Sequence, residues 1–191
     1  VLEEATDPSI PLLERLRFLG ISGSNLDEFF RVRVGGLQAQ VAQGVTRPDP
    51  AGLTPRQQLE AISRRVRELV DTQAACYRDD LEPKLAAAGI RRLRPDGLTA
   101  AQRRLVRRIF ENEVFPILTP VAVTHEDEFP LLPNQVLSVC VRLAPRKGET
   151  DQPDRYAVIP FGSGAPRFLS LPADTGIAHL LLEDAVHMFA D

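Results

Sequence analysis

The sequence predicts an α+β protein, in which an N-terminal antiparallel helical bundle is followed by the start of a small α+β domain with a mainly antiparallel sheet. Two observations carry this prediction. In the first part, apolar residues recur at steps of three and four, which is the period of a helix; later segments alternate apolar and polar residues, as strands do. We therefore expect a helical domain over residues 1–112 and the first part of an α+β domain over residues 113–191.

The first helices are indicated by caps and breaks. Residues 1–5 read as the end of a helix, and Pro11 suits the first turn of the next one. The glycines between positions 20 and 23 are expected to end that helix. Ser24 would then cap a new helix, with Asp27 completing an approximate capping box.

A long helix is expected to begin at Thr54, which is a good N-cap followed by Pro55. Its apolar seam is heptad-like and is interrupted only by Gln73. Pro83 should kink this helix or start a new segment, and Gly89 suits its C-terminal end. Thr99 is expected to cap one more helix. The seam consists of Leu59, Ile62, Val66, Leu69, Gln73 and Cys76.

The remaining residues are predicted to form three strands and a final helix. The strands are expected over residues 135–143, 155–161 and 167–172, where alternation or short apolar runs occur. Residues 176–191 read as a helix. Because three strands make a thin sheet, we expect the domain to continue beyond Asp191.

Composition limits the class of protein. Of 191 residues, 43% are hydrophobic and 26% charged, which fits a chain with a buried core. The net charge of −3 gives no reason to expect nucleic acid as a partner, and no apolar run is long enough for a transmembrane segment. Cys76 and Cys140 are expected to be buried free thiols in a reducing compartment. Because the chain opens at Val1, we expect its natural N-terminus to lie upstream.

The stretch "ISGSNLDEFFRVRVGGL", residues 21–37, gathers polar residues that have two interpretations. Asn25 could satisfy backbone groups at a helix start, or it could bind a ligand. Asp27 and Glu28 would repel a phosphate there, whereas a neutral amide both donates and accepts hydrogen bonds, as the edge of a base requires. The second interpretation therefore favours the adenine end of a nucleotide.

These residues also carry a family resemblance. "IPLLERLRFLGISGSNLDEFFRVRV", together with "IFENEVFPILTPVAV", "YAVIPF", "RFLSLP" and "LLLEDAV", resembles the N-terminal domain and the opening of the head domain of type 1 polyphosphate kinases. The resemblance extends over nearly the whole chain, and its most specific part is the block "SNLDEFF".

The resemblance implies a four-domain enzyme that reversibly transfers the γ-phosphate of ATP to inorganic polyphosphate through a phosphohistidine, with Mg²⁺. Its catalytic histidines belong to two C-terminal domains, so no catalytic residue or metal ligand is expected in this chain, which alone should be inactive. Asn25 matches the asparagine through which the N-terminal domain contributes to the nucleotide site, and we expect it to contact the adenine of ATP. The resemblance further implies ADP as product, contacts with the enzyme's own C-terminal domains, homo-oligomers through the head domain, and a cytoplasmic location with membrane-surface association left open.

Other polar and aromatic groups receive structural interpretations. Asp27 and Glu28 point about 100° apart on a helix, so they should cap or form salt bridges with Arg31 or Arg33 rather than bind Mg²⁺ together. Phe29 and its neighbour Phe30 are expected in the core. The three histidines, His125, His179 and His187, are not assigned as catalytic.

Two arginine groups leave a rival function open. They lie on the polar sides of predicted helices, near acidic residues, so a solvated or interdomain face is the default interpretation. Arginine forks also suit polyanions. The rival is therefore a non-catalytic helical adaptor or polyanion-binding module. The groups comprise Arg64, Arg65 and Arg67, and Arg103, Arg104, Arg107 and Arg108.

Overall fold

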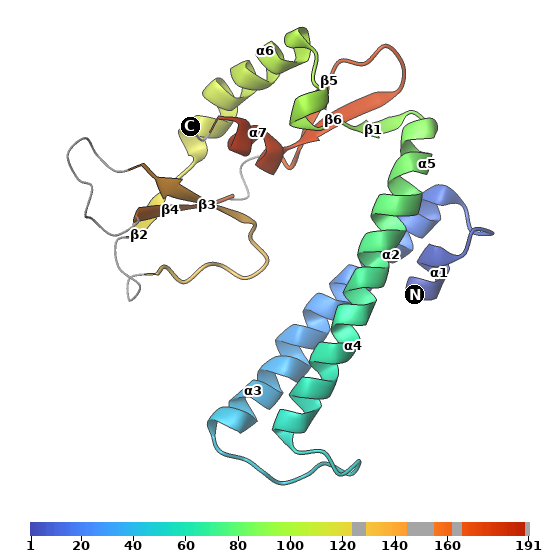
Figure 1. Ribbon diagram of the computed structural model, residues 1–191, viewed down its shortest axis with the longest axis vertical. Helices are drawn as coiled ribbons and strands as arrows, with labels where there is room; N and C mark the ends of the chain where they lie inside the picture. The colour runs from blue at the N-terminus through green and yellow to red at the C-terminus, as the bar shows by residue number, and fades with distance from the viewer. Residues whose placement is uncertain (124–128, 145–154, 162–165, 190–191) are drawn as a thin grey trace. The chain divides into compact units, whose positions relative to one another are not determined.

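The chain consists of two compact units, Val1–Ala88 and Gly89–Asp191. The first is helical, and the second combines helices with two small sheets, so the predicted α+β class is confirmed (Figure 1). The computed structural model describes residues 1–123, 129–144, 155–161 and 166–189.

Two antiparallel helical rods form most of the first unit (Figure 1). After α1 (Leu2–Thr6), the first rod runs through α2 (Leu12–Phe29), the π-helical turn η1 (Phe30–Val34) and α3 (Gly35–Ala42). The second rod runs through α4 (Pro55–Ala75), the π-helical turn η2 (Cys76–Leu81) and α5 (Glu82–Ala87). Within the described residues, no helix is both long enough and apolar enough to cross a bilayer.

The predicted break at Gly20–Gly23 is wrong, because α2 continues through it. Ser24 is not an N-cap; it lies inside the helix and its hydroxyl donates to the carbonyl oxygen of Gly20 at 3.2 Å. A helical glycine costs only about 1 kcal/mol, which tertiary packing can offset. Here the packing includes a hydrogen bond from the side-chain amide of Gln73 on α4 to the hydroxyl of Ser22, with N–O 2.8 Å.

This Ser22–Gln73 hydrogen bond also explains the interruption in the predicted seam of α4. Gln73 occupies an apolar position of the heptad pattern, but its partly buried amide has a hydroxyl partner on the facing helix. A buried polar group without such a partner would be destabilising. The pair therefore favours one register of the two rods.

The local start and stop signals of the other helices are confirmed. Thr54 and Gln57 form a capping box at α4, and Thr99 and Gln102 form the same arrangement at α6. Pro83 lies in the first turn of α5, after η2. The expected buried thiol is found at Cys76.

A buried arginine joins the elements at one end of the first unit. The side chain of Arg15 on α2 is 3% exposed, and its Nε donates to the carbonyl oxygen of Ala5 at 2.8 Å. Its guanidinium also pairs with the carboxylate of Asp80, which pairs in turn with Lys84. Arg15 thereby ties α1 and α2 to η2 beside the apolar cluster of Ala5, Cys76 and Leu81.

We expect acid to weaken this network. The ammonium of Lys84 and the guanidinium of Arg15 hold the pKa of Asp80 below its ordinary value. Asp80 therefore stabilises the fold fully above the pKa of an unfolded aspartate, about 3.9, and this contribution disappears as the pH falls through the lower native pKa. Measuring the free energy of unfolding from pH 6 down to pH 2.5 tests this.

In Asp80→Asn, the free energy of unfolding should decrease less between pH 6 and pH 2.5 than it does in the unmodified chain. Asp71→Asn serves as the control, because it removes the same charge from an exposed position on α4 for which the described residues give no ion pair. Equal pH profiles for the two variants would contradict the assigned role of Asp80.

The second unit contains two three-stranded sheets. Its elements in chain order are β1 (Ile90–Arg92), the 3₁₀ turn η3 (Pro95–Gly97), α6 (Ala100–Ile109), the π-helical turn η4 (Phe110–Val114), the 3₁₀ turn η5 (Phe115–Ile117), β2 (Val121–Val123), β3 (Ser138–Leu143), β4 (Arg155–Pro160), β5 (Phe168–Leu171), β6 (Ile177–Leu181) and α7 (Leu182–Met188). The strand orders are β1–β6–β5 and β2–β4–β3. β1 and β6 are parallel, and the other pairs are antiparallel.

Three expectations about this unit are corrected. Residues 177–181 form the strand β6 and not part of a helix, and burial alternates along this strand. A short apolar run of this kind cannot be assigned to a strand or a helix from periodicity alone. There are two sheets among the described residues, and β1 and β2 were not predicted. Cys140 lies exposed on β3, which is an edge strand of its sheet.

The helix α6 belongs to the second unit, whereas the sequence pattern predicts the domain boundary after residue 112. Val106 on α6 is fully buried, in a cluster with Leu169 on β5 and Leu180 on β6. Phe110 and Val114 of η4 lie in the neighbouring cluster with Leu182 and Val186. The apolar side of α6 thus packs on the strands that follow it in the chain.

The sheet β1–β6–β5 begins at a close approach of two glycines. The amide of Ile177 donates to the carbonyl oxygen of Gly89 at 2.7 Å, immediately before the parallel pairing of β1 with β6. Gly89 and Gly176 have φ of +87° and +74°, a region that side chains other than glycine rarely adopt. A Cβ on Gly176 would overlap the carbonyl of Gly89.

Candidate functional site

Asn25 lies exposed in the body of α2. Its side chain makes no hydrogen bond within the described part of the chain, and it is 13 residues after the helix start at Leu12, about 20 Å along the axis at 1.5 Å per residue. The capping interpretation of Asn25 is therefore wrong. The amide is available to a ligand, and the positive end of the helix dipole is too distant to help bind phosphate there.

Apolar side chains flank Asn25 on the helix. Ile21 and Phe29 lie one turn before it and one turn after it, and each is 39% exposed. We call Ile21, Asn25 and Phe29 the Asn25 face. An exposed amide between two apolar groups can bind a planar base, with apolar contacts on the rings and hydrogen bonds at the base edge.

The two phenylalanines are not in the core, so that expectation is wrong. Phe29 is 39% and Phe30 42% exposed, and their rings meet edge to face with centroids 6.3 Å apart. Helical periodicity places Phe29 and Phe30 on the apolar side of the first rod, but the contact between the two rods buries only part of that side. Val34 and Leu37, further along the rod, are buried instead.

The acidic residues after Asn25 do not converge on a common point. Glu28 forms an exposed ion pair with Arg31, with an N–O distance of 3.1 Å, as expected. Arg33 donates instead to the amide oxygen of Gln58 on α4 at 3.0 Å. Among the described residues, no group of three histidine, cysteine or acidic side chains could hold a metal ion.

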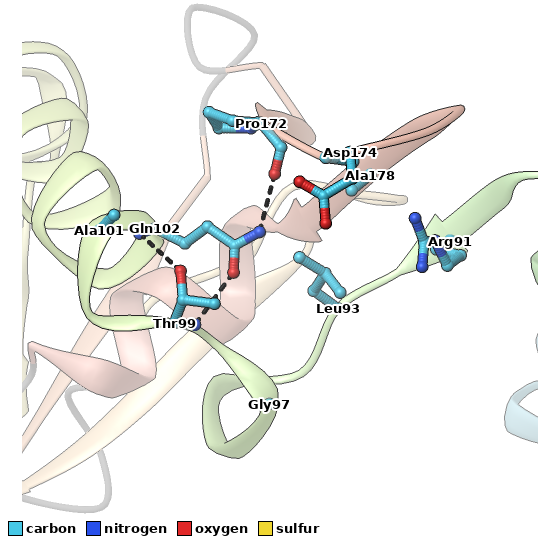
Figure 2. Close-up of a pocket in the computed structure, with 10 residues that line it drawn as sticks. Arg91, Leu93, Gly97, Thr99, Ala101, Gln102, Pro172, Asp174 and Ala178 are labelled. Carbon is cyan, nitrogen blue, oxygen red and sulfur yellow. Dashed lines mark hydrogen bonds between the residues drawn. The ribbon is translucent and has the colours of Figure 1, made fainter.

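A second candidate is a pocket in the second unit, which the sequence did not predict (Figure 2). It has a volume of about 440 Å³ and lies between the start of α6 and the turn joining β5 to β6. The side chain of Gln102 donates to the carbonyl oxygen of Pro172 at 2.8 Å, and Arg91 donates to that of Thr175 at 2.9 Å. The side chains of Gln102 and Arg91 are therefore already engaged in hydrogen bonds within the pocket wall. Asn25 is the stronger candidate for ligand binding, because its amide has no such bond among the described residues.

The histidines show no catalytic arrangement in the described residues. His179 on β6 packs edge to face against Phe168, with ring centroids 5.3 Å apart. His187 is exposed in the last turn of α7. His125 lies outside the described residues.

Comparison with known proteins places the chain among polyphosphate kinases. The family description "Polyphosphate kinase N-terminal domain" matches residues 1–93, and "Polyphosphate kinase middle domain" matches residues 101–191. Polyphosphate kinases from Exiguobacterium sp. (strain ATCC BAA-1283 / AT1b) and Pseudomonas aeruginosa are 44% and 39% identical to this chain over its whole length. The chain spans 26% and 28% of their lengths, respectively.

A solved structure supports the same assignment. The crystal structure of polyphosphate kinase from Porphyromonas gingivalis superimposes on the whole chain with a TM-score of 0.84 and 29% identity, and the chain covers 28% of it. The similarity thus includes both units, and the two family matches together extend over most of the chain. The chain therefore belongs to the polyphosphate kinase family, of which it carries the N-terminal domain and residues of the middle domain.

Proposed function

We propose that this chain is the N-terminal part of an enzyme that reversibly transfers the γ-phosphate of ATP to inorganic polyphosphate. The transfer passes through a phosphohistidine outside these 191 residues, and Mg²⁺ is held outside the described residues as well. The family membership and the share of the relatives that the chain covers support this proposal. The chain alone is then inactive, because it lacks the phosphorylated histidine.

The role proposed for this chain is to contact the adenine of ATP through Asn25. The observation that carries it is an exposed amide that has no hydrogen-bond partner among the described residues and lies between the apolar side chains of Ile21 and Phe29. The phosphates of ATP lie away from this face, because Glu28 and Asp27 would repel them and no helix start is near. Transfer chemistry therefore takes place on other domains of the intact protein.

Assembly and location are part of the same proposal. The second unit provides a surface for homo-oligomer formation, and the first contacts the enzyme's own C-terminal domains around bound ATP or ADP. The enzyme works in the cytoplasm, and its association with the membrane surface is an open alternative.

The proposal is tested by substituting Asn25 in the intact protein that contains this chain. We expect Asn25→Ala to raise KM for ATP about tenfold, since a lost hydrogen bond can weaken binding by about 1.4 kcal/mol. The measurement is ATP-dependent extension of polyphosphate, with Gln38→Ala, an exposed amide on α3, as the control. An intact protein that extends no polyphosphate would contradict the proposed function itself.

A further inference from the structure

The exposed side of α6 carries four arginines within six positions. They are all solvent-exposed, and they occupy consecutive turns of one amphipathic helix whose opposite side is buried. We call them the α6 arginine face, which consists of Arg103, Arg104, Arg107 and Arg108.

Two of these guanidinium groups are held in place by the second unit. Arg103 donates to the carbonyl oxygen of Pro95 at 2.9 Å. Arg107 lies over the ring of Phe189, 5.0 Å from its centroid, and 3.7 Å from a carboxylate oxygen of Glu111. Since their side chains are already ordered, binding an anion would restrict them less than it restricts free arginines.

The other two guanidinium groups have no partner among the described residues. Arg104 and Arg108 are separated by one helical turn, so their Cβ atoms lie about 5–6 Å apart on the same side of the helix. Neither forms an ion pair or a hydrogen bond in the described ranges. The guanidinium groups of Arg104 and Arg108 can therefore bind neighbouring anionic groups of a linear ligand.

The charge around α6 is positive, although the whole chain has a net charge of −3. α6 itself contains no acidic residue, and of Glu111 and Glu113 in the turn after it, Glu111 pairs with Arg107. The arginines of α4 differ, because the same helix also carries Glu60, Glu68 and Asp71. α6 therefore has the stronger local positive charge of the two helices.

We propose that the α6 arginine face binds inorganic polyphosphate. The inference rests on the proposed function for the identity of the ligand and on α6 for its location. Guanidinium forks match phosphate oxygens, and a row of arginines matches a linear polyanion. Surfaces for single-stranded nucleic acid add aromatic platforms for the bases, and α6 has no aromatic residue.

The test measures binding of long-chain sodium polyphosphate to the 191-residue chain between 50 and 200 mM NaCl. The double variant Arg104→Gln/Arg108→Gln should bind about tenfold more weakly at 50 mM NaCl. The slope of log K against log salt should become shallower by about 1.4, which is 0.7 for each lost phosphate contact. The matched control is Arg64→Gln/Arg67→Gln, which removes the same charge from exposed positions of α4.

The site is supported if the α6 variant loses affinity for polyphosphate and the control variant binds as tightly as the unmodified chain. An equal loss in both variants, or no loss in either, would overturn it. Oligothymidylate binding as tightly as polyphosphate, with the same dependence on Arg104 and Arg108, would overturn the assignment of the ligand. Kinase activity of the intact protein is scored separately, so this site can fail while the proposed function stands.

Discussion

Gly176→Ala is expected to destabilise the second unit by about 3 kcal/mol. The new methyl group would overlap the carbonyl of Gly89 and lie 2.9 Å from its Cα, both backbone atoms that no rotamer change can move. Alanine at φ +74° adds strain of about 1 kcal/mol. Relief requires β1 to move away from β6, which breaks the parallel pairing that begins at Ile177.

The matched control is Gly89→Ala, at the same junction. Its φ of +87° is equally unfavourable, but a Cβ there meets only the Cα of Gly176, at an ordinary 3.6 Å. We expect a loss of about 1 kcal/mol, from backbone strain alone. Urea unfolding of both variants measures the difference, and equal losses would show that the close approach of the two backbones contributes nothing.

Arg15→Ala is expected to destabilise the first unit by a similar amount, about 3 kcal/mol. The substitution leaves the carbonyl oxygen of Ala5 and the carboxylate of Asp80 without their guanidinium partner, and it opens space beside a buried apolar cluster. Arg15→Lys should lower the free energy of unfolding less than Arg15→Ala does, because lysine keeps the positive charge. It should still be destabilising, because lysine lacks the planar guanidinium that reaches both acceptors.

Arg17→Ala provides the control for Arg15. The side chain of Arg17 is 73% exposed, and its ion pair with Glu14 spans 3.7 Å, so we expect a change within about 0.5 kcal/mol. Thermal and urea unfolding of the three variants should give the order Arg15→Ala, Arg15→Lys, Arg17→Ala, from least to most stable. Equal stability of Arg15→Ala and Arg17→Ala would contradict a structural role for the buried guanidinium.

Sequence patterns predicted the features that depend on neighbouring residues. The sequence predicts Thr54 and Thr99 as caps from the residue type, and the capping boxes that they form each lie within four residues. Ser24 is not a cap, because a contact between Ser22 and Gln73 on α4 holds α2 together through its glycines, and the local pattern does not contain that contact. The strand at residues 177–181 was missed for a related reason, since its partners lie on β1 and β5, and leucine-rich runs suit both helix and strand.

The candidate site was only partly predictable. The block around Asn25 pointed to a base-binding amide, but it also suggested a helix cap, which the structure excludes by continuing α2 through that position. Phe29 was predicted in the core, and its exposure emerges only when the packing of the two rods is known. The pocket beside α6 combines residues from β1, α6 and the β5–β6 turn, so no single stretch indicates it.

The proposed contact between Asn25 and adenine is tested most directly by a double-mutant cycle in which the protein and the nucleotide are both changed. In the intact protein, kcat/KM is measured for ATP and for purine riboside triphosphate, which lacks the 6-amino group, with the unmodified enzyme and with Asn25→Ala. If Asn25 binds the base edge, each single change lowers kcat/KM about tenfold, and the two together lower it little further. Losses that multiply, or equal activity of Asn25→Ala and the unmodified enzyme with ATP, would contradict the contact.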